Sequence, residues 1–315
     1  MTNLNFLTKG QISQIEKKYE LPVYVYSEDK LLKAVENFKK FPSAFWHTVR
    51  YAMKANSCLN ILRLFNKNWI KIDSSSEYEA ERAINAWFKP EDIQLSWQES
   101  PKKLKKLVNK WVFFVATSLN QLKEVWRLCP GSERRVRINP WVWSAAFKRI
   151  NTWWWISSFW IWHEYISEIK KIANIYNLKI VKVHIHIWSE NTPKSWVASA
   201  NIWLDFVENF DDVKILNMWW WFKKAIMPYE ESADLEAIWN AVKEKFEDFY
   251  KSTWRKIKLE VEPWKYMVID SCSVIAKIVD IVDTWEEWYK FLRTNTGMTE
   301  MPRVTMYWVQ QPIIV

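Results

Sequence analysis

Glycine is almost missing from this chain. Three glycines occur among 315 residues, whereas an average composition of about 7% would supply roughly 22. A chain of this size needs many turns with positive φ and many close approaches of its backbone, and glycine supplies most of them. We therefore expect another residue type to stand at those positions.

Other absences restrict the class of protein. No apolar run has the length that spans a membrane, and the N-terminal stretch "MTNLNFLTKG" lacks the apolar core of a signal peptide. The three cysteines, Cys58, Cys129 and Cys272, are isolated and odd in number, which indicates a reducing compartment and no disulfide framework. We expect a cytoplasmic protein with no membrane partner.

Tryptophan is present in excess, at 25 residues, and glycine and tryptophan together come close to a normal glycine total. Trp87 follows a helix-like segment in "INAWFKPEDI", where a glycine usually ends the helix. Trp69, Trp111 and Trp254 also fall between a lysine-bearing helix pattern and an apolar strand. Our hypothesis is that most tryptophans stand where the functional protein has glycine, as a UGA codon read as glycine in the source would produce. The alternative is a chain that is truly rich in tryptophan.

The net charge of +9 is compatible with nucleic-acid binding through basic side chains and stacked tryptophans. However, the densest basic run, "SPKKLKKLVNK", carries apolar residues at helical spacing and is typical of a solvated helix face. Because the tryptophans are better explained as glycines, we expect no nucleic-acid partner.

Strand-like and helix-like segments alternate along most of the chain. After a first strand, "LPVYVY", the further strand candidates are "VRYAMKAN", "IKIDSS", "IQLS", "VFFVATS", "RVRINP", "IVKVHIHI", "VKILNM" and "IKLEVEP". Almost every gap has room for a helix, so this pattern predicts an α/β protein with a (β/α)8 TIM-type barrel. The alternative is an open doubly wound sheet, but no dinucleotide-binding fingerprint follows the first strand, even with Trp read as Gly.

The pattern changes after Pro263, where consecutive strands with a turn near Thr284 replace the alternation. The last stretch, "QQPIIV", resembles an interrupted strand. We therefore predict three parts. Residues 1–27 form an N-terminal segment whose strand joins a β-domain, residues 28–265 form the barrel, and residues 266–315 form a truncated C-terminal β-domain.

In a (β/α)8 barrel, catalytic groups gather at the carboxyl ends of the strands. Here separate strands deliver to that rim the side chains of Lys54, His184, His186, Glu262 and Lys265. The two histidines alternate along one strand and share a face, but no third ligand is evident, so we expect no metal site. The triple tryptophan that follows the seventh strand lies where such barrels commonly bind phosphate. Read as three glycines, it would expose backbone N–H groups to an anion.

A lysine, an acid and a phosphate cradle together suggest pyridoxal 5'-phosphate, whose ring serves as an electron sink. The motifs resemble those of the barrel-type (fold III) pyridoxal-phosphate decarboxylases, and within them the diaminopimelate decarboxylases. "YAMKAN" resembles the strand of the cofactor lysine, "HIHIWSE" the family's H-x-H-I-G-S-Q, "NMWWWF" its L-G-G-G-F and "EPWK" its E-P-G-R. "TGMTEMPRVTMYWVQQPI" is similar to D-x-G-M-x-x-x-x-R-P-x-L-Y-G-A-x-H-x-I. The resemblance covers nearly the whole chain, so residues 28–265 are expected to bind the cofactor.

The resemblance implies a role for each matching residue. Lys54 would bind the cofactor covalently and later move protons, His186 would stack on the ring, and Glu262 would pair with the pyridine nitrogen. Asp73 and Arg137 would form an ion pair near the ring. The remaining cofactor contacts would come from Ser189, Trp219, Trp220, Trp221, Pro263, Trp264 and Lys265.

The resemblance also implies a reaction, the decarboxylation of an amino acid. Arg303 and Tyr307, four residues apart, would hold substrate carboxylates, since a guanidinium suits a carboxylate bidentately. A distal carboxylate favours meso-diaminopimelate, giving L-lysine, over ornithine, arginine or carboxynorspermidine. Active sites shared between subunits in the family imply a homodimer. The alternative from another class is a non-catalytic homologue that binds the cofactor or a partner enzyme, or a gene fragment.

The chain departs from the family pattern at several points. Lys265 stands where the family usually has arginine, Glu190 where it has glutamine, and Asn295 where it has aspartate. The family's later Cys-Glu-x-Gly-Asp segment and a late tyrosine have no counterpart. With tryptophan at 188, 219–221 and 264, the chain as written is expected not to bind the cofactor, because indole side chains of about 150–250 Å² do not fit where backbone touches phosphate.

Overall fold

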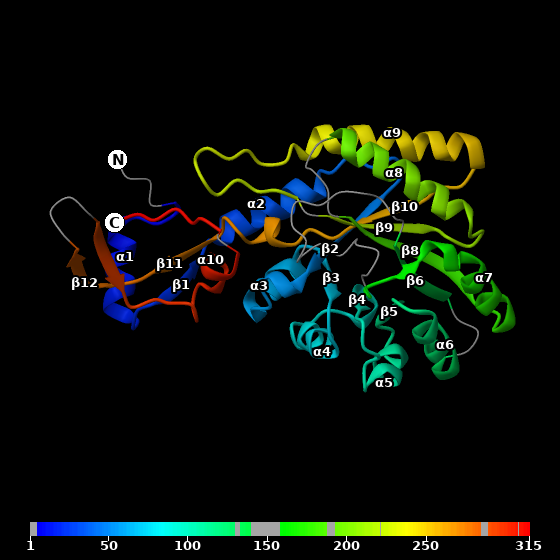
Figure 1. Cartoon of the computed structure of the whole chain (residues 1–315), viewed down its shortest axis with the longest axis horizontal. Helices are drawn as coiled ribbons and strands as arrows, with labels where there is room; N and C mark the ends of the chain where they lie inside the picture. The colour runs from blue at the N-terminus through cyan, green and yellow to red at the C-terminus, as the bar shows by residue number, and fades with distance from the viewer. Residues whose placement is uncertain are drawn as a thin grey trace. The chain divides into compact units, whose positions relative to one another are not determined.

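The computed structural model describes residues 5–129, 133–139, 158–187, 193–220, 222–284, 289–307 and 309–315. Its contacts divide the chain into two compact units. The larger unit consists of Ala34–Lys223 and Ala233–Met267, and the smaller unit of Met1–Lys33, Lys224–Ser232 and Val268–Val315. In the larger unit, helices surround a central set of strands (Figure 1).

The strands of the larger unit form a closed parallel barrel. The sheet runs in the order β5-β4-β3-β2-β10-β9-β8-β6, and a pairing between β5 and β6 closes it. The bounds are β2 (His47–Ala52), β3 (Lys71–Ser74), β4 (Ile93–Ser96), β5 (Phe113–Ala116), β6 (Glu133–Asn139), β8 (Lys179–Ile187), β9 (Ile215–Trp220) and β10 (Lys258–Val261). The short strand β7 (Ile161–Trp162) pairs with β6 in addition. Each barrel strand falls on a segment that the sequence predicts, so the (β/α)8 barrel is confirmed.

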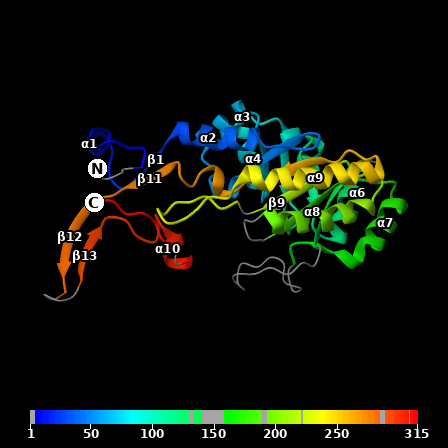
Figure 2. The ribbon, with the colours of Figure 1, turned by 90° about the horizontal axis from the view of Figure 1, so that it is seen from above.

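Helices follow the strands and cover the outside of the barrel. They are α3 (Leu59–Lys67), α4 (Glu77–Asn85), α5 (Leu104–Asn109), α6 (Leu119–Leu128), α7 (Ile166–Ile175), α8 (Pro193–Glu208) and α9 (Leu235–Thr253), and α2 (Glu28–Lys39) precedes β2. Side-chain oxygens at the N-caps of α4, α6 and α9 accept a backbone N–H of the first turn, which fixes where each helix begins. The last two helices, α8 and α9, lie side by side (Figure 2).

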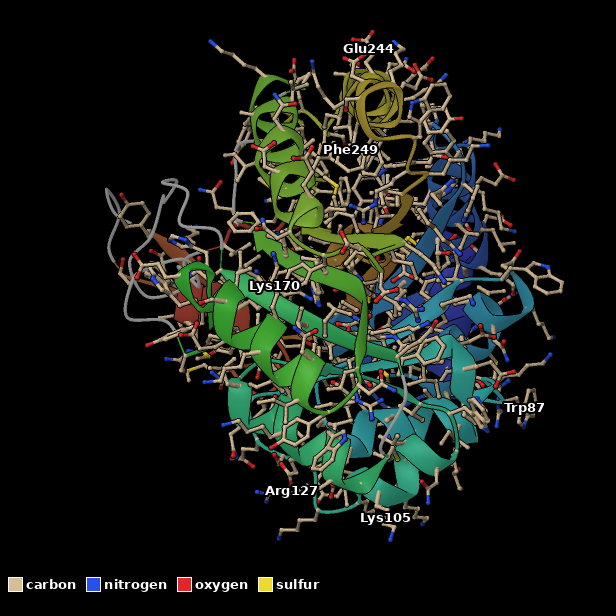
Figure 3. All side chains as sticks on the ribbon, turned by 90° about the vertical axis from the view of Figure 1, so that its right-hand side faces the viewer. Trp87, Lys105, Arg127, Lys170, Glu244 and Phe249 are labelled. Carbon is tan, nitrogen blue, oxygen red and sulfur yellow. The ribbon has the colours of Figure 1, made fainter. Side chains whose placement is uncertain are left out.

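Four exposed tryptophans have the backbone conformation that favours glycine. Trp69, Trp87, Trp111 and Trp254 have φ of 65°, 72°, 73° and 59°, and their exposed fractions are 87%, 64%, 73% and 79%. Trp254 comes directly after a helix and the other three come two residues after one, and Figure 3 shows Trp87 at the outer edge of the ribbon. Left-handed backbone is costly for a residue with a Cβ atom, and an exposed indole recovers little by packing. The predicted glycine-like conformation at these helix ends is confirmed.

A fifth tryptophan, Trp239 in α9, is crowded inside the barrel's outer layer. Its side chain is fully buried, and its ring centroid lies 3.3 Å from that of Phe41. Aromatic pairs ordinarily pack with centroids about 4.5–7 Å apart. The buried indole N–H of Trp239 also has no hydrogen-bond partner among the residues that the structure describes, which costs free energy. Size and polarity both favour a smaller residue here.

The smaller unit contains two antiparallel strand pairs. Strand β1 (Val23–Tyr26) pairs with β11 (Cys272–Ile275), and β12 (Ile278–Asp283) pairs with β13 (Lys290–Thr294). Its helices are α1 (Lys9–Lys18) and α10 (Pro302–Tyr307). Residues 309–315 have no regular secondary structure, so the strand expected at "QQPIIV" is wrong. Pro312 lies within it and has no backbone N–H to give to a sheet.

Across the described part of the chain, no helix combines the length and the apolar character needed to cross a bilayer.

Candidate active site

Lys54 stands at the carboxyl end of β2. The sequence places it inside a strand, but the strand ends at Ala52, and Lys54 lies in a short 3-10 turn, η1 (Met53–Ala55). The backbone N–H of Ala52 donates to the carbonyl of Pro263 at 3.2 Å, which joins the ends of β2 and β10. The side chain reaches solvent at the barrel mouth, yet the surrounding protein lowers the pKa of Lys54 by desolvation, against the attraction of Asp73. A lower pKa makes the neutral, nucleophilic amine more available.

Glu262 directly follows β10 and is fully buried. Its Oε1 accepts a hydrogen bond from Gln94 Nε2 at 2.7 Å and another from Asn217 Nδ2. Its Oε2 accepts none within the described residues, and His184 Nε2 lies 3.5 Å from it. Burial, reinforced by the neighbouring charge of Asp73, raises the pKa of Glu262 to about 8. The site thus contains a carboxyl group with one oxygen held and one oxygen open.

His184 lies in β8 with its side chain buried in the barrel, 1% exposed. Burial, and then the charge of Arg137, hold its pKa well below the ordinary value, so the imidazole is neutral. Its strand neighbour His186 pairs through the backbone with Trp219 of β9. The side chain of His186 lies outside the described residues, and its stacking role stays a prediction.

The predicted ion pair between Asp73 and Arg137 is wrong. Asp73 Oδ1 accepts from Gln94 Nε2 at 2.9 Å, while Arg137 donates to Ser96 Oγ at 3.1 Å and stacks on Trp160. No direct contact joins the two charges, although both are described residues; they act on each other only at longer range. Both side chains instead take partners from β4, Gln94 for Asp73 and Ser96 for Arg137.

The expected phosphate cradle is only partly described. Trp219 and Trp220 are the last residues of β9 rather than a loop, and their side chains, like Trp221 and Ser189 as a whole, lie outside the described residues. Pro263 is buried, and Lys265 begins the turn η5 (Lys265–Met267). The phosphate contacts assigned to these positions therefore stay predictions.

The other predicted residues are placed as follows. Trp264 is half-buried, and its ring centroid lies 5.3 Å from Lys54 Nζ. Arg303 and Tyr307 both lie in α10, four residues apart, which puts them on one face of that helix. Arg303 is exposed, and the side chain of Tyr307 lies outside the described residues. Their role in holding substrate stays a prediction.

Sequence reasoning missed a group of polar side chains in the barrel interior. They are Arg50, Gln94, Lys182, Asn217 and Glu260, each no more than 2% exposed. Each is a single polar residue at an inward position of a strand whose neighbours are apolar, as in "IQLS" and "ILNM". The only sign of them in the sequence is this isolated polar residue, and the same pattern fits an exposed strand residue, because barrel interiors are ordinarily filled by branched apolar side chains. Among the described residues, no group of three or more His, Cys, Asp and Glu side chains could hold a metal ion.

Residues 29–269 match the family described as pyridoxal-dependent decarboxylase, pyridoxal binding domain. Since this match covers well over half of the chain, the protein belongs to the pyridoxal-dependent decarboxylases. The fold, and the placement of Lys54 and the buried Glu262 at the barrel mouth, agree with that class.

Among known proteins, the chain is similar to diaminopimelate decarboxylases. It is 28% identical over 313 residues to that of Buchnera aphidicola subsp. Acyrthosiphon pisum, covering 96% of this chain and 72% of the relative. It is 24% identical over 311 residues to that of Escherichia coli K12, covering 96% and 71%. A crystal structure of diaminopimelate decarboxylase matches with a TM-score of 0.88 and 22% identity, over 98% of this chain and 73% of that one.

Pyridoxal 5'-phosphate fits the described donor set in two respects. The unpaired, buried Oε2 of Glu262 suits a ring nitrogen that carries a proton, and Lys54 supplies an amine at the same mouth. One described side chain opposes the fit, because the indole of Trp264 takes up space beside the Lys54 amine. In the family motif E-P-G-R this position is glycine.

Proposed function

We propose that the protein, with glycine at the cofactor-contacting tryptophan positions, is a pyridoxal-phosphate-dependent decarboxylase of meso-diaminopimelate. The products are L-lysine and carbon dioxide. The observation that carries the proposal is that Lys54 and the buried Glu262 lie at the same barrel mouth, and that Glu262 Oε2 accepts no hydrogen bond from the described residues. The similarity to diaminopimelate decarboxylases supports the choice of substrate.

When bound, the cofactor supplies an electron sink for the pair of electrons left at the α-carbon as carbon dioxide departs. Lys54 would hold the cofactor covalently through its amine and, once the substrate amine has replaced it, would supply the proton that takes the place of the lost carboxylate at the α-carbon. Its lowered pKa suits both tasks, since the amine must be neutral to attack and protonated to donate.

Glu262 would face the ring nitrogen of the bound cofactor and keep it protonated. A pKa of about 8 means that Glu262 carries a proton at neutral pH, so it brings to the ring nitrogen the proton that the reaction needs. Once the proton is shared with that nitrogen, the carboxylate is stabilised by the amides of Gln94 and Asn217. His186 would stack on the ring, and the backbone at 219–221 would hold the phosphate.

The distal end of the substrate is assigned to Arg303 and Tyr307. A distal carboxylate suits the guanidinium of Arg303, whereas ornithine, arginine and carboxynorspermidine present a cation there. A homodimer with shared active sites and a cytoplasmic location are parts of the same proposal. Three free cysteines support the location.

The competing function is a non-catalytic homologue, and the position of the Trp264 ring beside Lys54 favours it for the chain as written. The test begins with a variant that carries glycine at 188, 219–221 and 264, titrated with pyridoxal 5'-phosphate. We expect a new visible absorbance band that Lys54→Ala removes, followed by release of carbon dioxide from meso-diaminopimelate. The absence of the band rejects cofactor binding altogether, and a band without carbon dioxide release supports the non-catalytic homologue. Faster release of carbon dioxide from ornithine or arginine than from meso-diaminopimelate would show that the substrate carries a distal cation instead of a distal carboxylate.

A further inference from the structure

Below Glu262, the barrel interior holds a buried ion-pair cluster that the proposed reaction does not use. Arg50 of β2 donates two hydrogen bonds to the carboxylate of Glu260 of β10, from Nε to Oε2 at 3.0 Å and from Nη2 to Oε1 at 3.1 Å. Lys182 of β8 donates to the same carboxylate. Burial alone would raise the pKa of Glu260, but Arg50 and Lys182 together hold it well below the ordinary value. Glu260 is therefore held as a carboxylate anion between its two cationic partners.

Gln94 of β4 connects this cluster to Glu262. Its Oε1 accepts from Lys182 Nζ, and its Nε2 donates to Asp73 Oδ1 at 2.9 Å and to Glu262 Oε1 at 2.7 Å. An ammonium group has only donors, so the atom of Gln94 that faces Lys182 must be the carbonyl oxygen. Turning the amide over would set donor against donor at Lys182, and acceptor against acceptor at any carboxyl oxygen of Asp73 or Glu262 that carries no proton. Lys182 thereby fixes which way the Gln94 amide points.

The fixed amide has a consequence for the two oxygens of Glu262. Oε1 takes the hydrogen bonds of both Gln94 and Asn217, while Oε2 has none from the described residues. Asn217 also approaches Glu260 Oε2, at 3.4 Å, so its amide is tied to the same cluster. Two amides anchored on buried charges therefore hold one oxygen of Glu262 and leave the other open.

We propose that Gln94 is a positioning residue for Glu262. Held in one amide orientation by Lys182, it occupies Oε1 together with Asn217 and reserves Oε2 for the ring nitrogen of the cofactor. The inference rests on the proposed function for the identity of that nitrogen, but the anchoring of Glu262 belongs to the protein alone. In this proposal Gln94, Lys182 and Glu260 act through Glu262 rather than by contact with substrate or cofactor.

The test is made first on the cofactor-free protein as it stands. The protonated carboxyl of Glu262 has an infrared C=O band, identified by its loss in Glu262→Gln. In Gln94→Leu the carboxylate loses a hydrogen-bond donor, so we expect the band to titrate at a pH higher by about one unit or more. An unchanged titration in a folded Gln94→Leu protein overturns the proposal.

Two comparisons separate positioning from simple structural support. Gln121 is a second buried glutamine, 2% exposed, whose amide bonds to Thr117 and to the carbonyls of Trp97 and Gln98. Gln121→Leu is expected to destabilise the fold but to leave unchanged the pH at which the Glu262 band titrates. Lys182→Arg keeps a cation with donors only, so we expect the pH at which the Glu262 band titrates to stay unchanged. In Lys182→Met we expect that pH to rise. A shift in Gln121→Leu equal to that in Gln94→Leu contradicts the proposal.

The second arm uses the glycine-bearing chain and pyridoxal 5'-phosphate. We expect Gln94→Leu to weaken cofactor binding at least about tenfold, because a hydrogen bond to a charged group is lost. If the parent binds the cofactor and Gln94→Leu binds it equally well, the positioning role is rejected while the proposed function stands. If the parent does not bind the cofactor, the proposed function fails, and the infrared arm still decides whether Gln94 anchors Glu262.

Discussion

Gln94 Nε2 lies 2.7 Å from Glu262 Oε1, although 168 positions of sequence separate the two residues. Strands β3 and β2 stand between their strands in the sheet, so this contact crosses the barrel interior rather than joining neighbours. It places a neutral amide against a carboxyl group that burial and Asp73 have made a weak acid. The role proposed for Glu262 at the barrel mouth depends on this hydrogen bond from Gln94.

The pH dependence of stability should report the buried Glu262. Its folded-state pKa of about 8 is above its ordinary value, so between about pH 4.5 and 8 the folded protein holds a proton that the unfolded chain has released. Stability therefore falls as pH rises through this window. Urea unfolding at several pH values should show a smaller fall in Glu262→Gln than in the parent, and identical slopes would contradict the assignment.

The left-handed tryptophans should be destabilising. Trp69 is 87% exposed at φ 65°, and a side chain in this conformation costs about 1–2 kcal/mol. We expect Trp69→Gly to raise the free energy of unfolding by about 1 kcal/mol, whereas Trp69→Ala gains nothing because the Cβ atom remains. Trp46 is the matched control, since it is 50% exposed without a positive φ. Urea midpoints of the three variants decide the matter, and an equal gain in Trp46→Gly would contradict the backbone argument.

The same residues were accessible to sequence reasoning because their cause is local. A helix pattern followed by an apolar strand requires a left-handed residue between them, and this alone located Trp69 and Trp254. The barrel strands were predicted for the same reason, since alternation and apolar runs are properties of short segments. The short turn that carries Lys54 and the missing strand at "QQPIIV" were misjudged by a few residues, where helix, strand and turn patterns overlap.

The interior network could not be predicted in this way. A lone glutamine in "IQLS" or a lone lysine in "IVKVHIHI" looks like an exposed strand residue, and only barrel closure turns it inward. The partners of Gln94 come from β3, β8 and the end of β10, and no local pattern states that these side chains meet. The expected pair of Asp73 and Arg137 failed for the same reason, because their partners, Gln94 and Ser96, come from another strand.

The glycine hypothesis makes a direct prediction about the protein made by its source. Peptide mass spectrometry of the native protein should give a peptide across residues 215–223 that carries glycine at 219, 220 and 221. The structural basis is that Trp69, Trp87 and Trp254 have glycine-like backbone and Trp239 is crowded. A peptide mass that requires three tryptophans there would reject the hypothesis.

Arg303 should control substrate choice in the glycine-bearing enzyme. Arg303→Ala removes the fork assigned to the distal carboxylate, so kcat/KM for meso-diaminopimelate should fall about tenfold or more, a hydrogen bond to a charged group being worth about 1.5–3 kcal/mol. Arg303→Lys restores the charge without the fork and should recover only part of the loss. A variant that loses activity equally on ornithine and on meso-diaminopimelate would show a structural role instead.

The central claim is that Lys54 binds the cofactor. Borohydride reduction of the glycine-bearing protein with pyridoxal 5'-phosphate locks the cofactor onto the amine that holds it, and tandem mass spectrometry then locates it. The account predicts one modified lysine, Lys54, and none at Lys182, a fully buried lysine whose pKa is also lowered. Modification at Lys182, or scattered modification of surface lysines with Lys54 unmodified, would contradict it.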